Sequence, residues 1–110
     1  MYSKLILALV ASLALAGQAV AALDADSAKA YAKKNDCFKC HAPDKTKKGP
    51  SYKKIAAELR EKGKTDAKLF EHLTTGRKVK LEDGSEEEHK ALDKTEKAEI
   101  ENLIQWVRSH

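Results

Sequence analysis

The sequence predicts an all-α domain of about four short helices. Apolar residues recur at intervals of three and four positions in four stretches, which Gly and Pro residues separate, whereas strand-like alternation is confined to a few residues around Val79 and Leu81. Of the 110 residues, 42% are hydrophobic but only 5% are aromatic. A small domain with so few bulky side chains fills a core poorly. We therefore expect a further component to complete this core.

The first two predicted helices are delimited by capping and breaking residues. The first runs from residue 26 or 27 to residue 35, with Ser27 as a possible N-cap and its apolar face formed by Ala28, Tyr31 and Ala32. A loop follows over residues 41–50, and the second helix runs from near Ser51 to residue 63.

The third predicted helix runs from residue 65 or 66 to Gly76, which supplies its stop. Residues 77–94 are irregular, with room for at most a short hairpin around Asp83-Gly84. The last helix follows Thr95, a plausible N-cap, and ends at the C-terminus, because Ile100, Leu103, Ile104 and Val107 share one face.

The N-terminus has the pattern of a secretory signal peptide. Lys4 precedes an uncharged apolar stretch over residues 5–16, and small residues follow at positions 19–22. The stretch is too short for a confident membrane span, and acidic residues follow it, which argues against the alternative of an uncleaved anchor. We expect residues 1–22 to be a signal peptide, cleaved after Ala21 or Ala22, and residues 23–110 to be an exported, soluble domain without stable membrane insertion.

Removal of the signal peptide changes two counts. It leaves 20 Lys and Arg against 17 Asp and Glu, a net charge of +3, which is too small to indicate nucleic-acid binding. It also removes Met1, the only methionine in the sequence. The mature chain therefore has no methionine.

Cys37-Phe38-Lys39-Cys40-His41 is a C-x-x-C-H sequence, the attachment motif of a c-type haem. Two thiols two residues apart on a tight turn can add to the two vinyl groups of one haem, and the adjacent imidazole then binds the iron. The motif predicts one covalently attached haem c, with Cys37 and Cys40 as thioethers and His41 as the proximal iron ligand. Since haem is attached outside the bacterial cytoplasm in most such systems, the predicted location is the periplasm.

Three other interpretations of the motif are open. A zinc site could use both cysteines and two of His41, His72 and His89, but the histidines are widely scattered and form no second compact ligand pair. A thioredoxin-like disulfide belongs with a strand-helix-strand pattern that this chain does not have. The third interpretation is a chance match.

The chain resembles the class I cytochrome c family over essentially the whole mature sequence. The shared features are the helix leading into the C-x-x-C-H motif, the stretch Gly49-Pro50-Ser51-Tyr52-Lys53-Lys54-Ile55-Ala56, and Ile104-Gln105-Trp106-Val107 in the last helix. The resemblance implies a small class I fold of about four helices around the haem, with the first and last helices crossed and Trp106 against the face of Ala28. It also implies that the carbonyl of Pro50 accepts a hydrogen bond from the ring N–H of His41, which would orient that ligand.

The chain departs from this family at the sixth iron ligand. Most class I cytochromes use a Met in the loop before the last helix, and the mature chain has none. His89 lies in that loop and is the predicted distal ligand, which gives bis-histidine iron. The alternatives are His72, one of three lysines, or a five-coordinate iron, whereas the terminal His110 is expected to be frayed. The three lysines are Lys78, Lys80 and Lys90.

These observations predict an electron carrier rather than an enzyme. A second imidazole in place of a thioether favours ferric iron and lowers the potential. Redox partners would dock transiently at the haem edge, and six lysines near the haem-binding segment could steer an acidic partner or serve solubility. The alternative function is a gas-binding, sensing or weakly peroxidatic haem protein with a labile or absent sixth ligand. The six lysines are Lys39, Lys45, Lys47, Lys48, Lys53 and Lys54.

Overall fold

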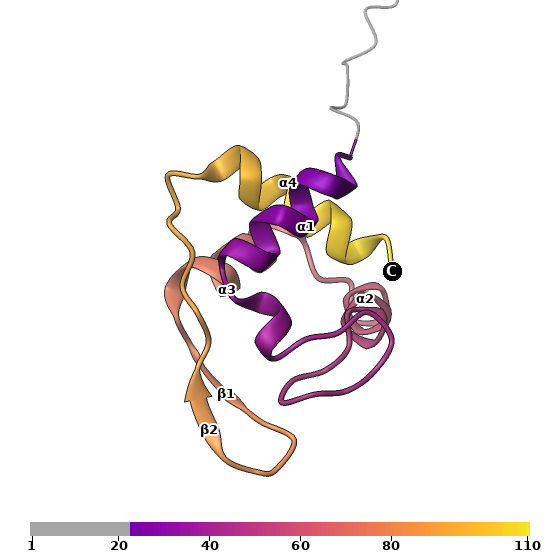
Figure 1. The fold of residues 1–110 in the computed structure, drawn as a ribbon, viewed down its shortest axis with the longest axis vertical. Helices are drawn as coiled ribbons and strands as arrows, with labels where there is room; N and C mark the ends of the chain where they lie inside the picture. Colours follow the sequence, from indigo (N-terminus) through magenta and orange to yellow (C-terminus); the bar gives the residue numbers. More distant parts are fainter. Residues whose placement is uncertain (1–22) are drawn as a thin grey trace, which may run out of the picture.

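The computed structural model describes residues 23–110, and the predicted signal peptide lies outside these described residues. Four α-helices, one 3₁₀ turn and one antiparallel hairpin follow one another (Figure 1). In chain order they are α1 (Ala25–Lys34), η1 (Cys37–Lys39), α2 (Tyr52–Glu61), α3 (Asp66–Thr75), β1 (Lys78–Lys80), β2 (Glu86–Glu88) and α4 (Lys97–Arg108). The predicted all-α class is confirmed. Among these residues, the helices are too short and too polar to span a membrane.

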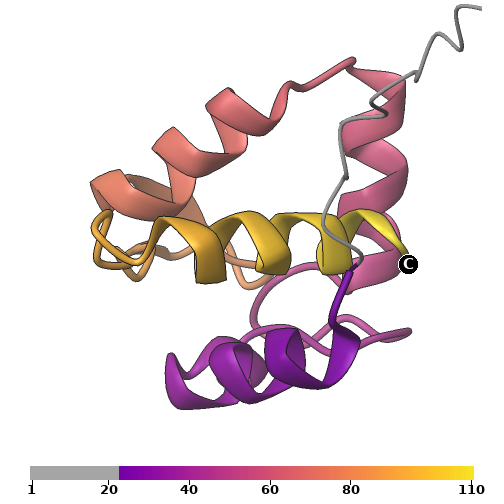
Figure 2. The same ribbon diagram turned by 90° about the horizontal axis from the view of Figure 1, so that it is seen from above.

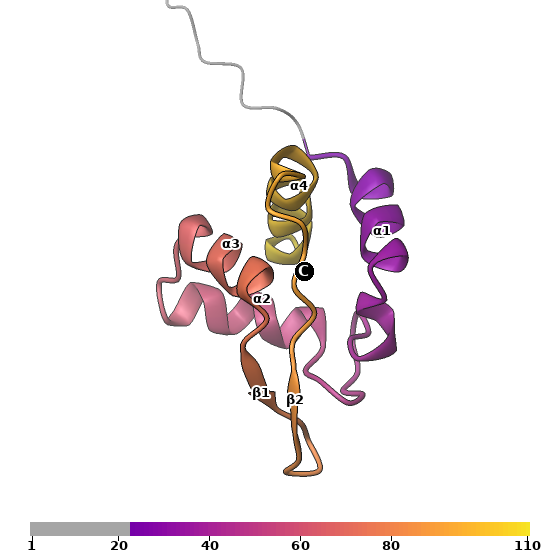
Figure 3. The ribbon, with the colours of Figure 1, turned by 90° about the vertical axis from the view of Figure 1, so that its left-hand side faces the viewer.

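Helix α4 is the centre of the fold. It packs against α1 on one side and against α2 and α3 on the other (Figures 2 and 3). Ala28 and Ala32 of α1 are completely buried, as is Ile100 of α4. Because alanine side chains are small, the two helix backbones can approach closely at this crossing. The crossed first and last helices agree with the class I fold.

Trp106 belongs to the same core cluster as Ala28, but its aromatic partners lie elsewhere. Its ring centroid is 4.9 Å from that of Tyr52 and 6.2 Å from that of Phe38, both in edge-on arrangements. The ring of His110 is 4.7 Å away, and its Nδ1 donates to the carbonyl of Trp106 over 2.9 Å. The expectation that His110 is frayed is therefore wrong, because this ring packs on the aromatic cluster.

The starts of α2 and α3 are as predicted, since the side chains of Ser51 and Thr65 cap them. The predicted cap of α1 is wrong. Asp24 is the N-cap, and its carboxylate accepts both the backbone N–H of Ser27, over 3.0 Å, and the Ser27 hydroxyl, over 2.7 Å. The predicted cap of α4 is wrong for a related reason. Asp93 accepts the N–H and hydroxyl of Thr95, which holds Thr95 in a turn before the helix.

The hairpin extends away from the helices (Figures 1 and 3). It pairs Lys78 with Glu88 and Lys80 with Glu86, so opposite charges face one another across the strands. Gly84, with φ of 85°, makes the turn. The short hairpin that the sequence allowed is present, and the chain that leaves it carries His89 back towards the helices.

Candidate functional site

A cavity of about 640 Å³ lies between the helices and the hairpin. This volume lies within the range of roughly 300–1,000 Å³ that is common for cofactor sites. Cys37, Cys40 and His41 line the cavity, together with His72 from α3 and His89 from the loop after β2. Apolar side chains from α2, α3 and α4 form much of the remaining wall: Ile55, Leu59, Leu69, Leu73, Leu103 and Ile104. The structure thus brings three histidines and both cysteines to one apolar cavity.

The two thiols are presented by a tight turn. Asp36 adopts the left-handed conformation, with φ of 62°, and this turns the chain from α1 into η1. The backbone N–H groups of Cys40 and His41 both donate to the carbonyl of Cys37, over 3.2 and 3.0 Å. Both cysteines are free and half-buried, and burial raises the pKa of the Cys37 thiol.

His41 is held by the loop that precedes α2. Its ring Nδ1 donates to the carbonyl oxygen of Pro50 over 2.6 Å, which leaves Nε2 as the lone-pair nitrogen. Burial lowers the pKa of His41, and the bond to Pro50 partly opposes this shift. Gly49 packs directly on the imidazole, because a Cβ at this position would lie 3.0 Å from the ring Cε1 atom.

His89 is fixed by backbone contacts. Its N–H donates to the carbonyl of Arg77 over 2.8 Å, and its ring Nδ1 donates to the carbonyl of Lys90 over 3.0 Å. Three residues on, the N–H of Leu92 donates to the carbonyl of Leu73 over 2.7 Å. The ring centroid of His89 lies 6.3 Å from that of His41. The loop thus holds His89 near His41, and within residues 23–110 the only hydrogen bond of the His89 ring is the one from Nδ1.

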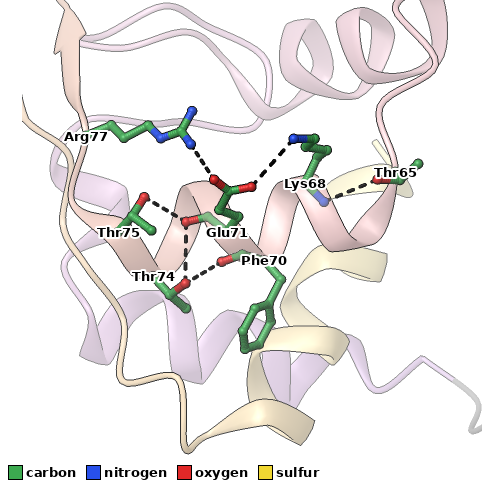
Figure 4. Close-up of polar contacts among 7 residues, drawn as sticks. All are labelled: Thr65, Lys68, Phe70, Glu71, Thr74, Thr75 and Arg77. Carbon is green, nitrogen blue, oxygen red and sulfur yellow. Dashed lines mark hydrogen bonds and ion pairs between the residues drawn. The ribbon is translucent and has the colours of Figure 1, made fainter.

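His72 is the third imidazole in the cavity. It belongs to α3, and its ring centroid lies 4.8 Å from that of His89. Burial lowers the pKa of His72, and His89 contributes in the same direction. The carboxylate of the adjacent residue, Glu71, forms ion pairs with Lys68 and Arg77 (Figure 4).

The six lysines that the sequence singled out are all exposed. A second, smaller cleft of about 330 Å³ has Lys47 and Lys48 on its walls together with hairpin residues that include Glu82 and Glu87. The N–H of Glu82 also donates to the carbonyl of Lys48 over 3.2 Å. The acidic hairpin therefore lies beside part of the lysine-rich loop and offsets some of its charge.

Several residues that shape the site carried no clear signal in the sequence. Gly49 leaves room for the His41 ring, and the backbone of Arg77 anchors His89. For Gly49, the only signal in the sequence was the Gly-Pro pair before a helix. Arg77 acts through its backbone carbonyl, and patterns of side chains do not reveal such an acceptor. Among residues 23–110, no three His, Cys, Asp or Glu side chains converge as a ligand cluster for a single metal ion, as the zinc interpretation would need.

The cavity and its donors fit a covalently bound haem. Without a bound group, the apolar lining of this cavity would be exposed to water, which is unfavourable. The hydroxyl of Tyr52, a cavity residue, is also buried without a partner among the described side chains. The class of protein that this fold and site define is a c-type haem protein.

Residues 25–110 match the family model of cytochrome c, and the chain belongs to the cytochrome c family. It is similar to a solved class 1 cytochrome, MtoD from Sideroxydans lithotrophicus ES-1, with 49% identity and a TM-score of 0.74 over 80% of this chain and 97% of that one. No curated protein matches the chain. The protein is therefore a class I c-type cytochrome, an electron carrier with one covalently attached haem c.

Proposed function

We propose that this cytochrome is a periplasmic, low-potential electron carrier whose haem iron is bound by His41 and His89. One observation carries the proposal: two half-buried imidazoles in one cavity, 6.3 Å apart between centroids, each donate Nδ1–H to a backbone carbonyl. Each therefore keeps Nε2 free for a metal.

The hydrogen bonds support ligation because they fix the tautomer. A histidine that binds a metal through one nitrogen usually donates its other N–H to a carbonyl, carboxylate or water. Pro50 accepts from His41, and Lys90 accepts from His89. Both hydrogen bonds therefore support ligation of the iron through Nε2.

The separation of the rings supports the same pair. Imidazoles that bind one metal from opposite sides place their centroids on the order of 6 Å apart, since each metal–nitrogen bond is about 2 Å. The distance between His41 and His89 falls at this value. His72 lies closer to His89, at 4.8 Å, which is too short for those two rings to be the opposed pair.

The residues of the chain account for the chemistry of a carrier. When bound, the haem supplies a one-electron Fe(III)/Fe(II) couple. Cys37 and Cys40 would tether it, His41 and His89 would bind its iron in both oxidation states, and the apolar wall would limit the access of water. With two imidazoles and no methionine in residues 23–110, we expect a lower potential than in Met-ligated relatives.

The ligand proposal is tested with low-temperature EPR on the ferric wild-type protein and on His72→Ala. Both should give a low-spin bis-imidazole spectrum with the same g values, because His89 is the distal ligand in both. A high-spin wild-type protein would refute the electron-carrier coordination and favour the gas-binding alternative. A wild-type low-spin signal that His72→Ala converts to high-spin would show that α3 supplies the distal ligand.

The predicted signal peptide supports export, and the exposed lysines support docking with an acidic redox partner.

Since Lys47 and Lys48 face the acidic hairpin, Lys53 and Lys54 at the start of α2 are the clearest pair to test. Lys53→Glu/Lys54→Glu should slow oxidation by hexacyanoferrate(III), an anionic redox probe, by about three- to tenfold at low salt. The matched control, Lys94→Glu/Lys97→Glu, has the same net charge at the start of α4. If both variants are slowed equally, the effect depends only on the net charge of the protein, and the proposal of local steering by Lys53 and Lys54 is wrong.

A further inference from the structure

His72 has no evident role in the proposed coordination. It is the third histidine of the haem cavity, and the structure gives its ring nitrogens no hydrogen-bond partner within residues 23–110. By contrast, His41 and His89 each donate to a carbonyl. The ring of His72 is therefore available to a group bound in this cavity.

A hydrogen bond that orients His89 does not account for the position of His72 in the cavity. The two rings lie 4.8 Å apart at an angle of 47°, and the structure records no hydrogen bond between them. The Nδ1 of His89 is occupied by the carbonyl of Lys90, and its Nε2 is the proposed ligand atom. No nitrogen of His89 is left to accept a hydrogen bond from His72.

The two histidines lie on different kinds of element. His72 is in the middle of α3, whose start is capped by the Thr65 hydroxyl (Figure 4) and which packs against α4. His89 lies on a loop held by a few backbone hydrogen bonds, one to Arg77 beyond the end of α3 and one, from Leu92, to Leu73 within it. Loops of this kind open locally at a lower cost in free energy than helices packed in a fold.

We propose that His72 is a reserve axial ligand, which binds the haem iron when the loop carries His89 away. This inference rests on the proposed ligation by His89. In the exchange, one iron–nitrogen bond to His89 breaks and one to His72 forms. Both imidazoles are neutral, so no proton or electron is gained or lost. His72 would keep the distal side closed to diatomic gases and peroxides, and so preserve the protein as a carrier.

The main test compares the ferric EPR spectra of three variants. His89→Ala should remain low-spin with altered g values, because His72 takes the vacant position, while His72→Ala/His89→Ala should be high-spin. His110→Ala, whose ring packs on Trp106 outside the cavity, is the control and should match the wild type. A high-spin His89→Ala protein would overturn the reserve role and leave the His41–His89 assignment intact. A double variant that stays low-spin would also overturn it, because another side chain would then be the substitute.

A kinetic test keeps His89 in place and does not depend on how well His89→Ala folds. Carbon monoxide is mixed with the reduced wild-type and His72→Ala proteins. His72 competes with the gas each time His89 dissociates, so His72→Ala should bind carbon monoxide several-fold faster. Equal rates in the two proteins would overturn the proposal, even if EPR supports bis-histidine ligation.

Discussion

At the residue scale, the lack of a side chain at Gly49 matters as much as the side chains proposed to bind the haem iron. The C-x-x-C-H motif alone predicts Cys37, Cys40 and His41, because their chemistry depends on spacing along the chain. The sequence does not reveal that Gly49 touches the His41 ring, because that contact forms only when the loop folds back. His72 and His89 are likewise 17 positions apart in the sequence, and only the return of the hairpin places their rings 4.8 Å from each other.

Gly49→Ala should disturb the proximal ligand. The added Cβ would lie 3.0 Å from Cε1 of His41, so the ring must shift, at a cost of about 1–3 kcal/mol. We expect a lower unfolding temperature together with a changed EPR spectrum and reduction potential. Gly63→Ala is the control for backbone strain alone, since Gly63 has a positive φ of +59°, which Gly49 does not, and nothing lies within 4 Å of its Cβ position. It should lose about 1 kcal/mol without a spectral change. If Gly49→Ala leaves the haem spectrum unaltered, the crowding argument is wrong.

At the element scale, local sequence signals predict the helices well and their first residues less well. Ser51, Thr65 and Gly76 delimit α2 and α3 as expected. Ser27 and Thr95 fail as caps because an acidic residue two or three positions earlier captures their N–H and hydroxyl groups. Neighbouring side chains compete to accept the free N–H groups at the start of a helix, and residue type alone does not show which of them is the cap.

The crossing of α1 and α4 depends on small side chains. Ala28 is completely buried there, whereas Ala30 on the same helix is exposed. Ala28→Leu should therefore destabilise the protein by about 1–3 kcal/mol through overpacking, and Ala30→Leu should change its stability by less than about 0.5 kcal/mol. Chemical denaturation followed by circular dichroism measures both. Similar stabilities for the two variants would contradict the close crossing.

At the scale of the whole molecule, the cofactor completes the core. The small aromatic content of the sequence indicated a missing component, and the structure has a 640 Å³ cavity where the cysteines and histidines meet. The sequence could not give the shape of this cavity, because α2, α3, α4 and the hairpin form it together.

Loss of the haem tether should accordingly unfold the chain. Cys37→Ser/Cys40→Ser removes both thioether bonds, so the haem is retained only by its axial ligands or is lost. We expect a marked loss of helical circular dichroism when the haem is extracted from this variant, because the apolar faces of α2, α3 and α4 that line the cavity would then be exposed to water. A haem-free variant with the full helical signal and a cooperative melting transition would contradict this view of the core.

The buried tyrosines predict the response to alkali. Burial, and then the nearby charge of Glu96, raises the pKa of Tyr31 to about 12, and burial also raises the pKa of Tyr52. The folded protein therefore retains protons that the unfolded chain releases above about pH 10. Stability from these groups is present below that pH and falls as the pH rises towards 12. In an alkaline titration, tyrosinate absorbance should appear only as the helical signal disappears, whereas ionisation near pH 10 with intact helices would contradict the burial.

The central claim is that two histidines, His41 and His89, hold the iron of an electron carrier. Low-temperature EPR of the ferric wild-type protein tests it most directly, because the spin state reports whether both axial positions carry strong ligands. The account predicts a low-spin bis-imidazole spectrum whose g values are the same in the His72→Ala variant, because a change of ligand would alter them. A predominantly high-spin spectrum in the wild-type protein would contradict it.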